Sequence, residues 1–474
     1  MTAPGIGVAR IMWTNEQICR WTGGSLAPSG RGGVVERVVI DSRKARSGDA
    51  FVALCGERSD GHEFVESALA AGAVVAIVSS QRGFGGRPDC LEVPDPLMAL
   101  QEWAQGHLRE IDPTVVAITG SNGKTTTKEL VARVLGSLPG VARSTGNFNN
   151  QIGLPLSVLA MGRETRIAVL EMGMSSRGEI ARLVEIAPPE IALITNVGPA
   201  HLAGLGGVED VQRAKLEILG EGLSAPSLVV IPADDTSLVK AVESRVSGNT
   251  RLTRFGLGPG CDIRATEIEF LSNGGTRFQV EGMGRVTLSL PGVHNVMNAL
   301  AAAAVGREMG VTPDEIREGL ERADPVEMRS ERVCCQGITI INDAYNANPA
   351  SMAAAITAMS ELPTDGRKVL VLGDMLELGP RSRDYHRGVG MAVDAGRFDL
   401  LVTVGELSRD TSSAAGRLAG SGRTQHFETA VEAGDYVSNW VCVGDVVLVK
   451  GSRGGALEEV VSRLIEALNR GDRD

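Results

Sequence analysis

A glycine-containing loop between an apolar run and an amphipathic stretch is the feature that most constrains the fold of this chain. The run TVVAITG, residues 114–120, is short, apolar and rich in β-branched residues, which is typical of a buried strand. Residues 126–138 predict a helix, because one face gathers Leu130, Val131, Val134 and Leu135. A strand, a turn and a helix in this order predict a parallel sheet covered by helices.

The loop itself, TGSNGKT at residues 119–125, has the composition of a phosphate-binding turn. Glycines let backbone N–H groups turn inward around phosphate oxygens, and the following helix N-terminus adds partial positive charge. Lys124 supplies a charge for terminal phosphates, and the Thr125 hydroxyl is placed to ligate Mg²⁺. The common nucleotide loop has four residues between its glycines, whereas only Ser121 and Asn122 stand here. We predict a nucleoside triphosphate site, with ATP as the expected nucleotide. A glycine turn beside a solvated lysine is the alternative.

Three regions follow one another along the 474 residues, a length that suits about three domains. Residues 1–108 contain short strand-like runs around a helical stretch and predict a small α/β domain. Residues 109–325 alternate apolar runs, such as RIAVLEMG and EIALITNVG, with helical stretches, which predicts a central parallel sheet. The pattern restarts with GITIIND, RKVLVLG and DVVLVKG, so residues 326–474 predict a Rossmann-like domain. The expected fold class is α/β in three domains.

Charge and cysteine content exclude several kinds of function. The net charge of −11 argues against broad binding to nucleic acid or acidic membranes, although local positive potential can still hold small anions. No apolar stretch approaches the roughly 20 residues of a membrane helix, and the N-terminus does not resemble a signal peptide. The seven cysteines are scattered without a C-x-x-C pair, which is typical of reduced thiols. We expect a cytoplasmic monomer without membrane insertion.

Further motifs follow the loop in a fixed order: STGNFNNQIGLP, LEMG, ITNVGPAHL, AKLEIL and PGVHNVMNALAA. Together with TGSNGKT they resemble the Mur ligases and their folylpolyglutamate synthase relatives, which are ATP-dependent amide-forming enzymes. The resemblance covers the chain from about residue 36 to 465. It implies a UDP-sugar-binding domain at residues 1–108, a central ATP-binding domain at 109–325 and a C-terminal ligase domain at 326–474.

Motifs in the terminal domains narrow the resemblance within the family. NDAYNANPASM, LGDMLELG and KGSR resemble the members that take a D-alanyl-D-alanine dipeptide as the amine. DSRKARSGDAFVALCGERSDGHEF resembles the UDP-sugar-binding module, and the D-N-P-R signature of a member that takes a single amino acid is absent. The resemblance implies ligation of D-alanyl-D-alanine to UDP-N-acetylmuramoyl-tripeptide through an acyl phosphate, with ATP and Mg²⁺. Lysine and diaminopimelate both remain open at the third peptide position.

The same resemblance implies roles for individual residues. The implied catalytic residues are Lys124, Lys215, His201 and Arg329. The implied ATP-binding residues are Gly120, Ser121, Asn122, Gly123, Lys124, Thr125, Thr126, Asn295, Asn298, Arg329 and Asp343. The implied substrate-binding residues are Ser42, Arg43, Gly61, His62, Asn149, Asn150, Asn346 and Asn348. The implied Mg²⁺ ligands are Thr125, Glu171, His201 and, if CO₂ carbamylates it, Lys215.

Without the resemblance, plainer interpretations of these residues stand. Lys215 is then a helical surface lysine, His201 a structural histidine and Glu171 a solvated carboxylate at a strand end. Asn295 and Asn298, three residues apart on one helix face, suit an adenine edge but also suit polar caps. A related family ligase, a nucleotide-dependent switch and a phosphotransferase remain alternative functions.

Two further expectations concern a loop and the domain arrangement. Ala203 stands where the family usually carries an acidic residue, which leaves the geometry of the loop after His201 open. Contacts to ATP from both the central and the C-terminal domain imply domain closure. We therefore expect a hinge near residues 322–330 and an open form without ligands.

Overall fold

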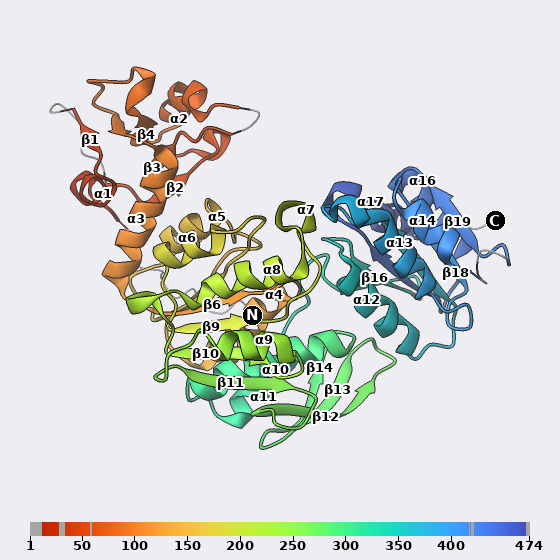
Figure 1. Ribbon diagram of the computed structural model, residues 1–474. Coiled ribbons are helices and arrows are strands. Elements are labelled where there is room, and N and C mark those ends of the chain that lie inside the picture. Colours follow the sequence, from red (N-terminus) through yellow and green to blue (C-terminus); the bar gives the residue numbers. More distant parts are fainter. Residues whose placement is uncertain (1–11, 28–33, 57–58, 417, 419–420, 471–474) are drawn as a thin grey trace, which may run out of the picture.

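Three β-sheets follow one another along the chain in the computed structural model, which describes residues 12–27, 34–56, 59–416, 418 and 421–470 (Figure 1). The central sheet lies between the N-terminal domain, drawn in red and orange, and the C-terminal domain, drawn in teal and blue. The predicted α/β fold class with three domains is confirmed. The predicted domain boundaries stay predictions. Residue 108 lies inside α3 (Pro96–Ile111), and residue 325 follows α11 (Pro313–Glu321).

The N-terminal domain is built on a five-stranded sheet in the order β1-β5-β4-β3-β2. β2 to β5 are parallel, and β1 pairs antiparallel with β5. Trp13 lies edge-on against Trp103 of α3 with ring centroids 5.2 Å apart, so this helix is packed into the core of the domain. The elements are β1 (Ser25–Leu26), β2 (Arg37–Val39), β3 (Asp49–Val52), β4 (Val75–Ser79), β5 (Cys90–Val93), α1 (Asn15–Thr22) and α2 (Val65–Ala70).

The central sheet has nine strands in the order β14-β13-β12-β11-β10-β9-β6-β8-β7. The strands from β7 to β12 run parallel, whereas β13 and β14 add an antiparallel edge. Val115 and Ala117 of β6 pack into one core, and Val116 and Ile118 into another, so both faces of the strand are buried. The strands are β6 (Thr114–Thr119), β7 (Val141–Arg143), β8 (Ile167–Glu171), β9 (Ile191–Ile194), β10 (Leu228–Pro232), β11 (Arg251–Gly256), β12 (Ile263–Phe270), β13 (Thr276–Val280) and β14 (Gly284–Leu288).

Helices cover both faces of the central sheet. The alanine-rich α10 packs against α4, and its small side chains from Ala301 to Ala304 are fully buried. Within the described ranges, no helix is both long and apolar enough to cross a lipid bilayer. The helices are α4 (Lys124–Val134), α5 (Gly153–Leu159), α6 (Glu179–Ile186), α7 (Leu202–Leu205), α8 (Val208–Lys215), α9 (Thr236–Glu243), α10 (Val293–Glu308) and α11.

The C-terminal domain has a six-stranded sheet in the order β15-β16-β20-β17-β18-β19. Its strands are parallel except for β15, which pairs antiparallel with β16. The strands are β15 (Glu331–Cys335), β16 (Ile338–Asp343), β17 (Lys368–Gly373), β18 (Leu400–Val404), β19 (Thr424–Phe427) and β20 (Val446–Lys450). The helices are α12 (Pro349–Glu361), α13 (Ser382–Met391), α14 (Ser408–Ala414), α16 (Ala430–Trp440) and α17 (Glu458–Arg470).

Candidate active site

A cavity of about 620 Å³ lies between the central and C-terminal domains. Its walls come from the segments after β6, β8 and β9 on one side and after β16, β17 and β20 on the other. In parallel α/β sheets, binding loops lie at the carboxyl ends of the strands, and the walls of this cavity come from such loops. The predicted residues that line the cavity are Ser121, Asn122, Gly123, Lys124, Thr126, Asn149, Asn150, Glu171, His201, Asn295, Asn298, Arg329, Asp343, Asn346 and Asn348.

The shape of the loop after β6 requires glycine at positions 120 and 123. Their φ angles are +154° and +79°, in a region that side chains rarely adopt. A Cβ atom on Gly120 would lie 1.9 Å from Thr195 Oγ1, and one on Gly123 would lie 2.3 Å from Asn298 Oδ1. The loop is therefore shaped against the segment after β9 and against α10.

Polar contacts hold this loop to the segment after β9. The Asn122 N–H donates to Asn196 Oδ1 at 3.0 Å, and Asn122 O accepts from Thr195 Oγ1 at 2.6 Å. Ser121 Oγ donates to Gly198 O at 2.9 Å. Because these partners belong to the protein itself, the loop conformation is held without a ligand.

Lys124 begins α4 and folds back over the loop, where its Nζ donates to Gly120 O at 2.8 Å. Burial lowers the pKa of Lys124, while Glu171 raises it and Arg329 lowers it. The amino group therefore lies within electrostatic range of an acid and of a second cation. A cation inside such a loop at a helix N-terminus can hold the terminal phosphates of a nucleotide.

Glu171 ends β8 with 1% of its surface exposed, and both carboxylate oxygens have partners. Thr125 Oγ1 donates to Oε2 at 2.7 Å, and Asn149 Nδ2 donates to Oε1 at 2.7 Å. A carboxylate beside a hydroxyl group offers the oxygen ligands that Mg²⁺ prefers. The donor set of Glu171 and Thr125 therefore fits Mg²⁺.

Lys215, the last residue of α8, is only 2% exposed, so it is not the surface lysine that the sequence alone suggests. In the part of the chain that the structure describes, its Nζ has no hydrogen bond or ion pair. Burial lowers the pKa of Lys215 well below the usual range, and Lys124 lowers it further. These surroundings favour the neutral amine, which is the form of lysine that reacts with CO₂.

His201 precedes α7 and contacts the C-terminal domain, since its Nδ1 lies 2.7 Å from Glu377 Oε2. Burial lowers the pKa of His201, the Glu377 carboxylate raises it, and Lys124 and Lys215 lower it. The imidazole is therefore close to both lysines. His201 and Glu171 both line the cavity.

Asn295 and Asn298 lie on one face of α10, in keeping with their spacing. Asn298 Nδ2 donates to Asn295 Oδ1 at 3.1 Å, and Thr127 Oγ1 donates to Asn298 Oδ1 at 3.2 Å. Asn295 Nδ2 donates to Pro291 O at 2.8 Å and to His294 Nε2 at 3.2 Å. The pair thus joins α10 to the start of α4 at the wall of the cavity.

Exchange of His294 for glutamine is expected to reduce the loss of stability in mild acid. Burial lowers the pKa of His294 to about 4, while Asp343 raises it and Lys450 lowers it. Below the ordinary histidine pKa, His294 is protonated in the unfolded chain but stays neutral in the folded protein. The free energy of unfolding therefore falls as the pH drops. Between pH 7 and 5 this effect costs the folded protein about 2 kcal/mol. Denaturant unfolding of both proteins at these pH values measures it, and equal losses would contradict the prediction.

Arg329 reaches the cavity from the C-terminal side, and its guanidinium lies 3.9 Å from the centroid of the Tyr345 ring. Contact with an aromatic face restricts the orientation of a guanidinium group. On the same wall, Asp343 Oδ2 accepts from Lys450 Nζ at 2.7 Å, and Asp343 Oδ1 accepts from the Ser330 N–H at 3.0 Å. The charge of Lys450 is thus compensated by Asp343, whereas Arg329 faces the cavity.

Two asparagines of the NDAYNANPASM motif lie at the cavity, and one of them, Asn348, contacts the central domain. Asn348 caps α12, and its Nδ2 donates to Asn122 Oδ1 of the central loop at 2.7 Å. Asn346 O accepts from Lys450 Nζ at 3.0 Å. Across the cavity, the Asn150 side chain accepts backbone N–H groups at the start of α5.

Four predicted substrate-binding residues, Ser42, Arg43, Gly61 and His62, belong to the N-terminal domain and not to the lining of this cavity. Arg43 is exposed and pairs with Asp41 at 2.9 Å. Their role in holding a nucleotide sugar stays a prediction. They belong to two short 3₁₀ helices, η1 (Ser42–Lys44) and η2 (Gly61–Phe64).

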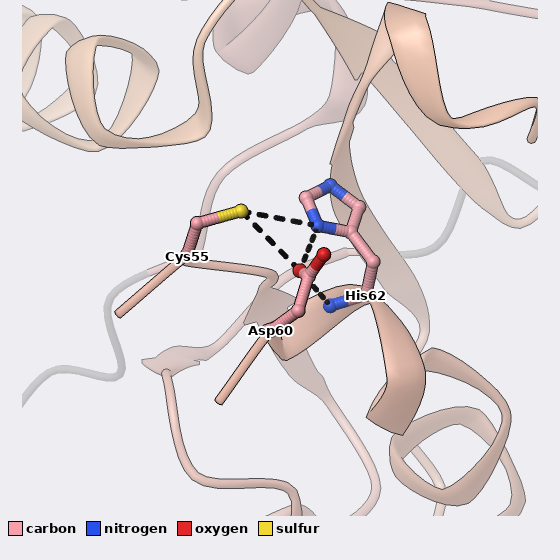
Figure 2. Close-up of side chains that lie close together, drawn as sticks. All are labelled: Cys55, Asp60 and His62. Atoms are coloured by element: carbon pink, nitrogen blue, oxygen red, sulfur yellow. Dashed lines mark hydrogen bonds and ion pairs between the residues drawn. The ribbon is translucent and has the colours of Figure 1, made fainter. Parts of the chain in front are cut away.

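Cys55, Asp60 and His62 lie close enough together to be tested as a metal site (Figure 2). The Ser79 N–H donates to His62 Nε2 at 2.9 Å, so the neutral ring carries its proton on Nδ1 and donates it to Asp60 Oδ1 at 2.6 Å. A metal on Nδ1 would displace that proton and leave both ring nitrogens without one. The backbone N–H and then the side chain of His62 lower the pKa of Asp60 to about 2. Hydrogen bonding therefore accounts for the cluster.

The residues at or beside the site that the sequence does not predict include Lys128, Tyr345 and Glu377. Lys128 is fully buried, and its Nζ donates to the backbone oxygens of Ser144 and Gly146, which holds the segment that carries Asn149 and Asn150. The signal for Lys128 was its place one turn after Lys124 on an otherwise buried helix face. Tyr345 and Glu377 stand inside the NDAYNANPASM and LGDMLELG motifs, and this position is the signal that points to them.

Models of known protein families match most of the chain. Residues 34–99 match the Mur ligase family, catalytic domain. Residues 118–306 match the Mur ligase middle domain, and residues 328–453 match the Mur ligase, glutamate ligase domain. The three matches follow the three sheets in order.

Individual relatives agree with these matches. The chain is 40% identical over 464 residues to the UDP-N-acetylmuramoyl-tripeptide--D-alanyl-D-alanine ligase of Bacillus subtilis (strain 168), covering 96% of this chain and 99% of that protein. A crystal structure of MurF from Acinetobacter baumannii has a TM-score of 0.85 at 34% identity, covering 97% of this chain and 100% of that one. MurF ligase from Thermotoga maritima in complex with ADP has a TM-score of 0.81 at 31% identity, covering 92% and 98%. The chain therefore belongs to the Mur ligase family.

Proposed function

We propose that this protein is an ATP-dependent ligase that joins D-alanyl-D-alanine to UDP-N-acetylmuramoyl-tripeptide through an acyl phosphate. The observation that carries the proposal is the convergence of Lys124, Glu171 and Arg329 on one cavity between two domains. Similarity over nearly the full length to a ligase of that name, and to a MurF structure solved with ADP, supports the substrates and the nucleotide. The reaction takes place in the cytoplasm, and one chain suffices because its three domains together enclose the substrates.

The first step activates the terminal carboxylate of the tripeptide. A carboxylate oxygen attacks the γ-phosphorus of ATP, the bond from the γ-phosphorus to the β–γ bridging oxygen breaks, and ADP leaves. The glycine loop and Lys124 hold the phosphates, and Arg329 brings a second cation from the C-terminal domain. Two anions must meet in this step, which explains why cations gather at the cavity.

Glu171, Thr125 and His201 are the residues that hold Mg²⁺ in this proposal. When bound, Mg²⁺ neutralises phosphate charge and orients the transferred group. Lys215 joins these residues as a carbamate, formed when its neutral amine attacks CO₂ and releases a proton. Burial of Lys215 supports this modification, because it favours the neutral amine and because the carbamate places an anion beside the Lys124 cation.

The second step forms the amide bond. The amine of D-alanyl-D-alanine attacks the acyl carbon, the bond from this carbon to the phosphate oxygen breaks, and phosphate leaves as the amine loses a proton. Asn149, Asn150, Asn346 and Asn348 line the cavity from both domains and orient the two substrates. Ser42, Arg43, Gly61 and His62 hold the nucleotide sugar in the N-terminal domain. Asn295, Asn298 and Asp343 face the nucleoside.

Purified protein with ATP, Mg²⁺ and UDP-N-acetylmuramoyl-tripeptide is expected to release phosphate only when D-alanyl-D-alanine is added. The acyl phosphate is consumed by the amine, so turnover depends on the dipeptide. Phosphate release and product mass are measured in parallel, and the product should be the pentapeptide. Phosphate release without the dipeptide and without amide formation would favour a phosphotransferase or a nucleotide-dependent switch.

A further inference from the structure

The segment after β17 reaches from the C-terminal domain to the central domain at α7. Glu377 in this segment makes two contacts with the central domain, one through its side chain and one through its backbone. Its Oε2 lies 2.7 Å from His201 Nδ1, and its backbone oxygen accepts from the Ala203 N–H at 3.1 Å. Leu378 is buried beside it, whereas the Glu377 side chain is 64% exposed. The carboxylate is therefore held by His201 across the domain boundary and not by burial.

The two contacting segments are shaped against each other. His201 and Glu377 both have positive φ angles, 54° and 61°. Residues other than glycine rarely adopt such angles unless the surrounding structure holds them there. Gly379, at φ 67°, faces the same segment, because a Cβ atom there would lie 3.6 Å from Ala203 Cα. Ala203 has no side chain beyond Cβ, so the two backbones can approach. The loop after His201, whose geometry the sequence leaves open, is thus fixed by contact with the C-terminal domain.

The contact also decides which imidazole nitrogen of His201 is available. A carboxylate oxygen can only accept a hydrogen bond, so Nδ1 carries the hydrogen and donates it, and Nε2 keeps its lone pair. In the described part of the chain, no hydrogen bond or ion pair occupies Nε2. Because His201 and Glu171 line the same cavity, this free nitrogen suits a cation that a nucleotide brings with it.

We infer that Glu377 is a positioning residue for His201, and that this side of the cation site is complete only when the C-terminal domain is docked on the central domain. The inference rests on the proposed function for the identity of the cation, Mg²⁺. Since histidine and carboxylate come from different domains, cation binding favours the docked arrangement, and docking in turn raises cation affinity.

The test compares three variants of the full chain: Glu377→Ala, Glu377→Gln and Glu361→Gln. Glu377→Ala removes the acceptor, whereas Glu377→Gln keeps an oxygen that can accept from Nδ1. Glu361 is the matched control, an exposed glutamate at the end of α12 and outside the cavity lining. The Glu377 side chain is 64% exposed, so thermal unfolding of all three variants should match that of the wild type.

Cation affinity is measured directly, without turnover. Mn²⁺ replaces Mg²⁺ in the presence of a non-hydrolysable ATP analogue, and electron paramagnetic resonance counts the free ion. Loss of a partner that orients a metal-binding histidine typically weakens binding by 10- to 100-fold, so Glu377→Ala should bind Mn²⁺ about tenfold more weakly or worse. Glu377→Gln should lie between Glu377→Ala and the wild type, and Glu361→Gln should equal the wild type.

Small-angle scattering adds a second readout. The wild type with Mn²⁺ and the analogue should stay compact, and Glu377→Ala should be less compact under the same conditions. Unchanged Mn²⁺ affinity and unchanged compactness in Glu377→Ala would overturn the inference. Failure of the wild type to form the amide, with the Mn²⁺ effect intact, would instead overturn the proposed function and leave the role of Glu377 standing.

Discussion

Replacing Lys124 with methionine is expected to lower the rate of dipeptide-dependent phosphate release by about 10³-fold. The amino group is the cation inside the glycine loop. It interacts electrostatically with Glu171 and Arg329 around the site of phosphate transfer. Without this amino group, a positive charge that stabilises the transferred phosphoryl group is lost. Methionine has a similar length, and among the described residues the hydrogen bond lost is the one to Gly120 O, so the fold should persist. Phosphate release and thermal unfolding, measured together, test both statements.

Lys240→Met is the matched control for this substitution. Lys240 is exposed on α9 and does not line the cavity, so the same chemical change there should leave the rate unaltered. A Lys124→Met protein that keeps more than roughly a tenth of the wild-type rate would contradict the role of Lys124. Arg329 would then be the cation that carries the phosphate charge.

The parallel core of the fold could be predicted because its strands are buried on both faces. β8, β9 and β10 are buried along their whole length, so each stands out as an unbroken apolar run. The antiparallel edge was missed for the opposite reason. In β13 only alternate residues, Thr276, Phe278 and Val280, are buried, and five residues of alternation are a weak signal.

The candidate site could be predicted loop by loop, but not the contacts between loops. The glycine loop, the asparagine segment and the end of β8 each carry recognisable residues, and the resemblance supplies their roles. That Asn149 and Thr125 both donate to Glu171 depends on the order of strands in the sheet, which no short motif encodes. His201 and Glu377 are 176 residues apart and meet only because two domains dock.

The burial of Lys215 also could not be predicted from the sequence. Val211 and Ala214 mark the buried face of α8, and a lysine after them would ordinarily extend into solvent. In the structure the end of α8 is packed inside the central domain, so the Lys215 side chain is buried near Lys124 and has no hydrogen bond or ion pair among the described residues. Such an amine is expensive for the folded state, and this favours a chemical role for it.

Replacing Lys215 with methionine is therefore expected to reduce ligase activity by about 10²- to 10³-fold without reducing stability. The pKa of Lys215 is lowered by burial, so at neutral pH the unfolded chain binds a proton more readily than the folded protein does. Removing the amine removes this disadvantage, and methionine fills a similar volume. In CO₂-free buffer the melting temperature of Lys215→Met should equal or exceed that of the wild type, while its phosphate release stays low.

Dependence on CO₂ separates the carbamate from a purely structural role for Lys215. The wild type should lose activity when CO₂ is removed and regain it when bicarbonate is added, because the carbamate forms reversibly. Lys215→Met should stay equally slow in both conditions, and Lys240→Met should follow the wild type. A wild type that is indifferent to CO₂ would leave Lys215 as an unmodified amine. In that case Mg²⁺ would have to be held by Glu171, Thr125 and His201 beside a fixed positive charge, or by a neutral lysine nitrogen, which Mg²⁺ accepts poorly compared with oxygen.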